Sequence, residues 1–260
     1  MVSPAVIVEL RDSIAIVRLN RPEKLNALSQ AMLEELSGAF KQFKKQSDLR
    51  AVILTASNET NFCAGTDIEE LAALDQNEAR AASERGQAVC NQIENLPVPV
   101  IAAINGIAAG GGCELALACH LRIASKNAQF SLPETKLGLI PAYGGTRRLP
   151  REIGYGRALE VMLTGKVLSA EQAYQLGLVN QVTDPVDVVT SAESLAMDIS
   201  KLAPLAVRAC LTAVTDGLDL PLQEGLALEA ELFASLFATQ DMREGTRAFL
   251  EKRTPVFKGT

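Results

Sequence analysis

The strongest constraint on the fold comes from two short runs, Ala51 to Thr55 and Val100 to Ile104, which are apolar at nearly every position. A strand with continuous rather than alternating apolar residues is typical of a sheet that is covered on both faces. Segments of helical periodicity lie between and beside these runs, so strands and helices alternate along the chain. This order predicts an α/β architecture.

Cap and turn signals place the other elements. Ser29 has the side chain of a helix N-cap and precedes a segment with apolar residues at helical spacing. Pro97 and Pro99 stop a long helical segment, because proline lacks the backbone donor that a helix interior needs. The expected elements are strands 6–10 and 14–19 as a hairpin, helix 28–45, strand 51–55, helix 68–96, strand 100–104, a glycine-rich turn 106–112, a helix from 113, and strands 121–124 and 128–131.

The last third of the chain has a different character. After Val182 the apolar residues follow helical spacing alone, in two long patterns over 185–216 and 221–253. We therefore expect two regions, an α/β core over residues 1–190 and an all-helical region over residues 191–260. The apolar faces of the second region predict either packing within the chain or an oligomer interface.

Composition excludes several functional classes. The formal net charge of -6 and an aromatic content of 4% without Trp argue against a nucleic-acid surface. The N-terminus lacks the basic leader of a secretory signal, and no apolar run is long and uninterrupted enough to span a membrane. The five cysteines have no C-x-x-C spacing, which predicts buried thiols in a reducing cytoplasm. His120 is the single histidine, so a histidine-rich zinc site cannot be assembled, and a histidine-based nucleophilic enzyme would depend on this one imidazole.

Two glutamates adjoin apolar or glycine-rich backbone. Glu114 follows three glycines and begins an apolar stretch, and Glu134 follows the segment Phe130–Pro133. An ionised carboxylate is costly to bury alone. Two carboxylates at one site suit acid/base chemistry, because their repulsion raises one of the two pKa values. Surface positions for both glutamates are the alternative that spacing alone leaves open.

Two loops offer backbone amides near these acids. Gly110–Gly112 precede the helix that carries Glu114, and free amides at a helix start point outward at the positive end of its dipole. In the segment Asn61–Ile68, small residues allow a ligand to approach the main chain, and Asp67 stands where a helix would begin. One amide from each loop could stabilise a developing oxyanion. Neither a P-loop nor a G-x-G-x-x-G motif between strand and helix is present.

Six ordered motifs resemble the enoyl-CoA hydratase/isomerase family, also called the crotonase superfamily, and most closely its two-glutamate hydratases. They are NRPEKLNAL (20–28), FCAGTDI (62–68), GIAAGGGCEL (106–115), PETKLG (133–138), PAYGGT (141–146) and FLEKR (249–253). The resemblance covers nearly the whole chain. It implies a crotonase-like spiral of β-β-α units followed by helices that mediate trimers, often stacked as hexamers. The implied activity is reversible syn addition of water to a 2-trans-enoyl-CoA, giving a 3-hydroxyacyl-CoA.

The resemblance also implies roles for individual residues. The thioester carbonyl oxygen would meet the backbone amides of Thr66 and Gly111, Glu114 would hold and activate the water, and protonated Glu134 would deliver a proton to the α-carbon. Coenzyme A belongs to the substrate, so no separate cofactor and no metal is implied. The residues expected around the coenzyme A portion are Lys24, Leu25, Ala64, Gly65, Asp67 and Ile68, with Phe249 and Lys252 reaching it from the same or a neighbouring subunit.

Some residues depart from the family pattern. Glu69 stands where many relatives place lysine, Ala142 replaces a frequent glycine, and His120 replaces a common aspartate and is interpreted as structural. Tyr143 either lines the acyl pocket or packs as an ordinary aromatic residue. Three alternative functions remain: hydration of a branched thioester such as 3-methylglutaconyl-CoA, double-bond isomerisation, and RNA binding. The last would use the helical lysines Lys41, Lys44 and Lys45, for which a solvated helix face is the simpler explanation.

Overall fold

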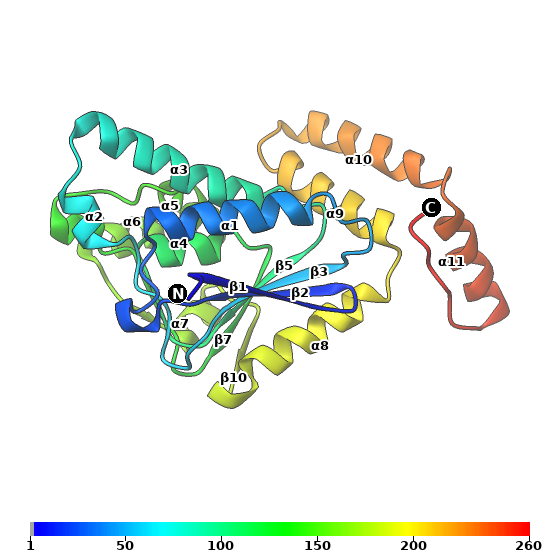
Figure 1. The fold of residues 1–260 in the computed structure, drawn as a ribbon. Coiled ribbons are helices and arrows are strands. Elements are labelled where there is room, and N and C mark those ends of the chain that lie inside the picture. The colour runs from blue at the N-terminus through cyan, green and yellow to red at the C-terminus, as the bar shows by residue number, and fades with distance from the viewer. Residues whose placement is uncertain (1–2) are drawn as a thin grey trace.

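The computed structural model describes residues 3–260 and contains two sheets (Figure 1). The first strand pair is antiparallel and the other pairs of the larger sheet are parallel. The strands of this sheet, in spatial order, are β1 (Val6–Arg11), β2 (Ile14–Leu19), β3 (Ala51–Ala56), β5 (Val100–Ile104), β7 (Leu121–Ser125) and β10 (Gln181–Thr183). The predicted hairpin and both apolar strands are therefore confirmed.

A smaller sheet is built from the residues that directly follow three of these strands. Its strands are, in spatial order, β4 (Asn61–Cys63), β6 (Ile107–Ala109), β8 (Gln129–Ser131) and β9 (Leu168–Ser169). The successive pairs β3–β4, β5–β6 and β7–β8 each give one strand to the larger sheet and one to the smaller. This repetition is the predicted spiral of β-β-α units.

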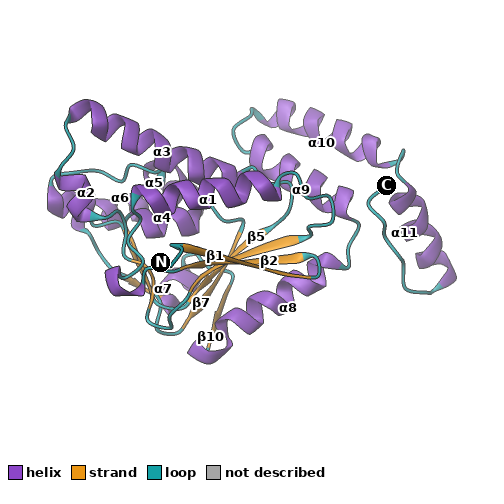
Figure 2. Cartoon of the chain, in the orientation of Figure 1, coloured by secondary structure: helices purple, strands orange, loops and turns teal. Residues whose placement is uncertain are grey.

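Helices cover both faces of the larger sheet, as Figure 2 shows. The helices of the α/β part are α1 (Gln30–Phe43), α2 (Ile68–Ala72), α3 (Gln76–Glu94), α4 (Gly111–Leu117), α5 (Gly145–Ile153), α6 (Tyr155–Thr164) and α7 (Ala170–Gln175). The helices that follow are α8 (Val188–Ser200), α9 (Pro204–Gly217), α10 (Leu222–Leu236) and α11 (Gln240–Glu251). Short 3-10 turns occur at Pro22–Lys24, Glu134–Leu137 and Pro185–Asp187.

Local capping chemistry accounts for several helix boundaries. The side chain of Ser29 accepts a hydrogen bond from the Met32 N–H at the start of α1, as predicted. The expected helix over 68–96 is instead two helices, because Asp75 forms a capping box with Glu78 and starts α3 anew. Pro204 likewise divides the expected helix over 185–216, since it begins α9 after a break.

The prediction of a turn over residues 106–112 was also partly wrong. Residues Ile107–Ala109 form strand β6, and α4 begins at Gly111 rather than at Cys113. The strand forms because β4 and β8 lie on either side of it and supply backbone hydrogen-bond partners that no local pattern announces. Strand β6 is therefore connected to the first turn of α4 by Gly110 alone.

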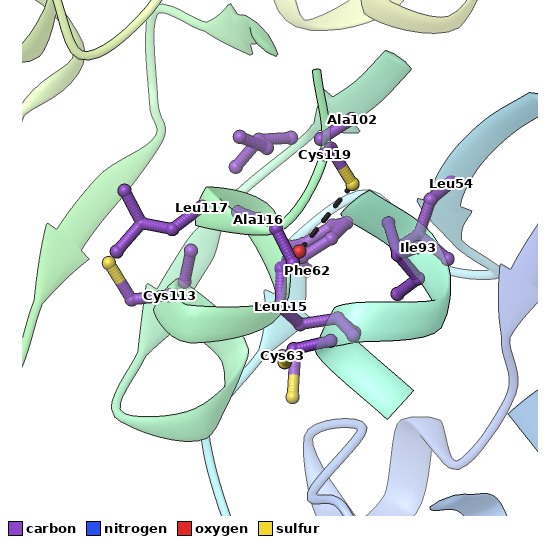
Figure 3. Packing of buried hydrophobic residues seen from close by; sticks show 14 of the residues in the cluster. Leu54, Phe62, Cys63, Ile93, Ala102, Cys113, Leu115, Ala116, Leu117 and Cys119 are labelled. Carbon is purple, nitrogen blue, oxygen red and sulfur yellow. Dashed lines mark hydrogen bonds between the residues drawn. The ribbon is translucent and has the colours of Figure 1, made fainter. Parts of the chain in front are cut away.

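Two buried apolar clusters hold the layers together. The larger lies between the sheets and α1, α3 and α4, where residues such as Phe62 and Ile93 are fully buried. Figure 3 shows part of it, including the Cys119 thiol that donates to the Leu115 carbonyl at 3.5 Å. The smaller cluster packs α8 against β3, β5 and β7 on the opposite face. Four cysteines are buried as predicted, but Cys210 is exposed on α9, because that helix leaves the sheets.

The C-terminal helices extend away from the sheets. In Figure 1, α10 and α11 lie to one side, at the end opposite α2. Helix α8 includes residue 190 and packs on the larger sheet, so the predicted boundary between the two regions lies within this helix. The division into two regions stays a prediction. No helix within residues 3–260 is both long enough and apolar enough to cross a membrane.

Candidate active site

Two backbone segments meet where the oxyanion amides were expected. Leu28 and Thr66 form an isolated parallel bridge, in which Leu28 bonds with the Gly65 carbonyl and the Asp67 N–H. In such a bridge the N–H of the central residue points away from its partner strand, so the Thr66 N–H faces the opposite side. Gly111 lies next to this segment, because its nitrogen would be 3.5 Å from a methyl group added to Gly65, and the Thr66 hydroxyl would be 3.2 Å from one added to Gly111. The two predicted amides therefore adjoin one another.

Glycine is required at this junction. Gly65 has a φ of +110°, and a methyl group on it would come within 3.0 Å of the Ala109 carbonyl oxygen. Gly112 is tighter still, because its added methyl group would overlap the Cys63 carbonyl at 2.2 Å. Since Gly111 begins α4, its N–H is one of the first-turn amides that the helix itself does not use. Close packing and helix geometry thus orient the amides together.

Glu114 is buried in the first turn of α4 and is held by backbone donors. Its Oε1 accepts the N–H of Tyr143 at 2.8 Å and that of Gly145 at 2.7 Å. Burial raises the pKa of Glu114 above its ordinary value, and these N–H groups, which favour the charged form, oppose the rise. The carboxylate of Glu114 is therefore buried and held in a fixed orientation. The alternative that Glu114 is a surface residue is excluded.

The turn that holds Glu114 is itself supported by one face of α3. Ser83 and Gln87 both donate to the Ala142 carbonyl, at 2.8 and 3.0 Å. Farther along the same face, Glu94 forms two hydrogen bonds with the guanidinium of Arg148, at 3.1 and 2.6 Å. Arg148 in turn donates to the Tyr143 carbonyl at 3.0 Å. Bidentate pairing of this kind is directional, so α3 positions the turn that positions Glu114.

Glu134 approaches the same place from the other side. It begins the 3-10 turn after β8, and its Oε1 would be 3.0 Å from a methyl group added to Gly110, directly before the helix of Glu114. Burial, together with the nearby charge of Glu114, raises the pKa of Glu134 to about 7. Its Oε2 is buried without a hydrogen-bond partner among residues 3–260. Near neutral pH, Glu134 can therefore hold or release a proton.

The family model for enoyl-CoA hydratase/isomerase matches residues 9–260. The chain belongs to this family. A putative enoyl-CoA hydratase/isomerase of Bacillus subtilis is 46% identical over 248 residues, covering 95% of each chain. A short-chain-enoyl-CoA hydratase of Clostridium acetobutylicum is 40% identical, again covering 95% of each.

A solved structure agrees closely with the fold. The crystal structure of an enoyl-CoA hydratase from Bacillus anthracis superimposes with a TM-score of 0.96 at 42% identity, covering 98% of this chain and 100% of that one. The similarity extends through the C-terminal helices as well as the two sheets. The predicted crotonase fold is therefore confirmed, and the geometry described above belongs to an enoyl-CoA hydratase/isomerase chain.

Residues expected around coenzyme A fall into two groups. The first group gathers beside Thr66: Lys24, Leu25, Ala64, Gly65, Asp67 and Ile68. Within it, Lys24 pairs with Glu69 at 2.8 Å, and both side chains are exposed. Leu25 and Ile68 are half exposed and present an apolar surface. Phe249 and Lys252 form the second group, at the far end of the chain on and after α11 (Figure 1).

His120 has a structural environment. Its Nδ1 accepts the Val100 N–H at 2.9 Å, and its Nε2 lies 3.0 Å from the Glu94 carbonyl oxygen, to which it donates as the neutral tautomer. Burial lowers the pKa of the imidazole, so the neutral form is favoured. The ring joins β5 to the end of α3.

Sequence reasoning missed the supporting residues. The Arg148 side chain is only 9% exposed, although an arginine that follows another arginine is normally a surface residue. Gly86, in the middle of α3, was not singled out, yet an added methyl group there would lie 2.1 Å from the Tyr143 ring. The glycine within a helical segment was the one signal in the sequence that could have indicated this close contact. Glycine lowers helix stability, so its presence there suggests that another group packs against it.

Proposed function

We propose that this protein hydrates short 2-trans-enoyl-CoA thioesters, with Glu114 and Glu134 as the acid/base pair and the amides of Thr66 and Gly111 as the oxyanion donors. Enoyl-CoA hydratase activity is supported by the family match and by full-length similarity to named hydratases. The observation that carries the residue roles is the arrangement of two carboxylates in different environments on either side of the Gly110–Gly111 amides. Environments that separate two pKa values assign one acid and one base.

The chemistry begins with polarisation of the thioester carbonyl. Two N–H groups aimed at its oxygen stabilise the enolate that forms when a nucleophile adds to the β-carbon. Each donor of this kind contributes about 3 kcal/mol to the transition state. Because both donors are main-chain groups packed by glycines, they need no reorganisation during the reaction.

Water addition then uses the two carboxyl groups in complementary states. The Glu114 carboxylate accepts a proton as the water oxygen bonds to the β-carbon, and the double-bond electrons move to the thioester oxygen. The carboxyl group of Glu134 gives its proton to the α-carbon as the carbonyl re-forms. The net change is addition of H and OH, and passage of one proton from Glu114 to Glu134 restores the starting state. Each role contributes roughly 10²- to 10⁴-fold.

Turnover of crotonyl-CoA tests this proposal. Glu114→Gln and Glu134→Gln are each expected to lower the hydration rate by at least about 100-fold while thioester binding persists. Glu84→Gln, at an exposed position of α3, is the matched control and should behave as the wild type. Loss of the enoyl absorbance follows the reaction directly. Near-normal turnover in either site variant would show that the dyad is not catalytic.

We also propose that the chain works as a trimer or a hexamer of two trimers. Large apolar side chains on the C-terminal helices are exposed in the single chain, among them Leu222, Phe233, Phe249 and Leu250. A cavity of about 880 Å³ between α9 and the α/β part has mostly apolar walls and includes Cys210. Because α11 lies far from its own α2, Phe249 and Lys252 would meet the coenzyme A bound to another copy. Sedimentation equilibrium would test this assembly, and a monomer at micromolar concentration would contradict it.

A cytoplasmic location remains a prediction from the cysteine pattern.

A further inference from the structure

A tyrosine closes the space beyond the reacting carbons. The ring of Tyr143 lies against two glycines, because methyl groups added to Gly86 and Gly111 would be 2.1 and 3.1 Å from ring carbons. The Thr66 hydroxyl also adjoins Gly111, 3.2 Å from the position of its added methyl group. Tyr143 and the Thr66 hydroxyl therefore both lie next to Gly111, one of the two amides proposed to bind the thioester oxygen.

An unpaired arginine stands beside this wall. Arg85 immediately precedes Gly86 on α3 and is half-buried, and its Nε is buried without a hydrogen-bond partner among residues 3–260. Its positive charge acts on the Tyr143 phenol, where it opposes the rise in pKa that burial causes. Arg85 is thus one residue away from the glycine against which the Tyr143 ring packs.

Three other shielded arginines among the described residues each have a carboxylate partner. Arg21, Arg122 and Arg148 each form an ion pair with a carboxylate of this chain, at distances from 2.6 to 3.1 Å. No such carboxylate lies within 4.0 Å of Arg85 in the described part of the chain. A partly buried guanidinium without an anion is unfavourable, and a planar carboxylate is the group that its donors fit best.

We infer that Arg85 binds a carboxylate at the far end of the acyl group, so that the substrate is a monothioester of a short unsaturated dicarboxylic acid. This inference rests on the proposed hydratase function and names its substrate class, which includes the branched 3-methylglutaconyl thioester. The two hydroxyls and the guanidinium form a polar end to the pocket. A longer hydrocarbon tail would have to displace the Tyr143 ring and leave Arg85 buried against apolar carbon, which is costly.

The test compares two thioesters that differ in one terminal group. Glutaconyl-CoA carries the carboxylate and crotonyl-CoA lacks it, so the ratio of their kcat/KM values reports recognition of the anion. We expect the wild type to favour glutaconyl-CoA, and Arg85→Gln to reduce the ratio by about tenfold or more, as for loss of a charged hydrogen bond. Arg85→Lys should restore part of the ratio. Arg80→Gln, an exposed arginine on the same helix, is the matched control.

The outcomes separate this inference from the function beneath it. A wild type that hydrates crotonyl-CoA but shows no preference for glutaconyl-CoA overturns the role of Arg85 and leaves hydratase activity standing. Equal losses on both thioesters in Arg85→Gln would assign the arginine to coenzyme A phosphates and overturn the inference as well. Failure of the wild type to hydrate either thioester would refute the proposed function itself.

Discussion

Titration of Glu134 is expected to set the upper end of the pH range in which the enzyme works. Its carboxyl group has a pKa of about 7, because burial and the neighbouring Glu114 charge both disfavour ionisation. Hydration needs the protonated form, whose fraction falls from about 0.9 at pH 6 to about 0.1 at pH 8 for a group with this pKa. The hydration rate should therefore drop about tenfold over this interval. Dehydration of the product uses the same singly protonated pair, with the proton on Glu114 instead of Glu134, so its kcat/KM should fall in parallel over the same interval.

The assay measures kcat/KM for both directions across this pH range. An acid limb at lower pH is expected from Glu114, which must be ionised to accept a proton and whose pKa is raised by burial. Glu134→Gln, which cannot titrate, should show low activity without the limb near neutrality, whereas Glu84→Gln should keep the wild-type profile. If the hydration kcat/KM stayed constant between pH 6 and 8, the assignment of Glu134 as the proton donor would be refuted.

Three further variants test the supporting structure. Gly86→Ala places a methyl group 2.1 Å from the Tyr143 ring and should lower the free energy of unfolding by about 1–3 kcal/mol in urea titrations; unchanged stability would contradict the packing. Arg148→Met leaves the Tyr143 carbonyl without its donor and should cost about 1–3 kcal/mol together with a fall in kcat, which Arg148→Lys would not fully reverse. Burial lowers the pKa of His120 in the folded state, so the unfolded chain binds more protons below about pH 6.5 and stability should decline as the pH falls. Thermal denaturation of His120→Asn should show a weaker decline, and an identical one would exclude this group as the cause.

Local chemistry explains which parts of the fold were predictable. The apolar strands, the β1–β2 hairpin and the caps at Ser29 and Asp67 depend on a few neighbouring residues, and the structure has them as predicted. The elements that differed depend on distant partners or on a competing cap. Strand β6 needs β4 and β8 beside it, and the helix expected from residue 68 ends early because Asp75 starts another.

The candidate site shows the same division. Glu114, Glu134 and the two glycine-containing loops could be chosen because buried carboxylates and small residues are unusual enough to require a reason. Their supports could not, since Arg148 and Glu94 are far apart in the chain and an arginine beside another arginine normally indicates solvent exposure. The packing of Tyr143 on Gly86 likewise joins residues from separate segments.

The amino-acid sequence alone determined the chemical groups available to this protein: two glutamates, free amides in glycine-rich loops, a single histidine and the alternation of strands and helices. Only the tertiary structure decided which of these groups act together and in which charge state. The physical reason is that burial, backbone donors and neighbouring charges set a pKa, and all three arise from segments brought together by folding. Glu114, Glu134 and Arg85 carry ordinary side chains whose properties here follow from that environment.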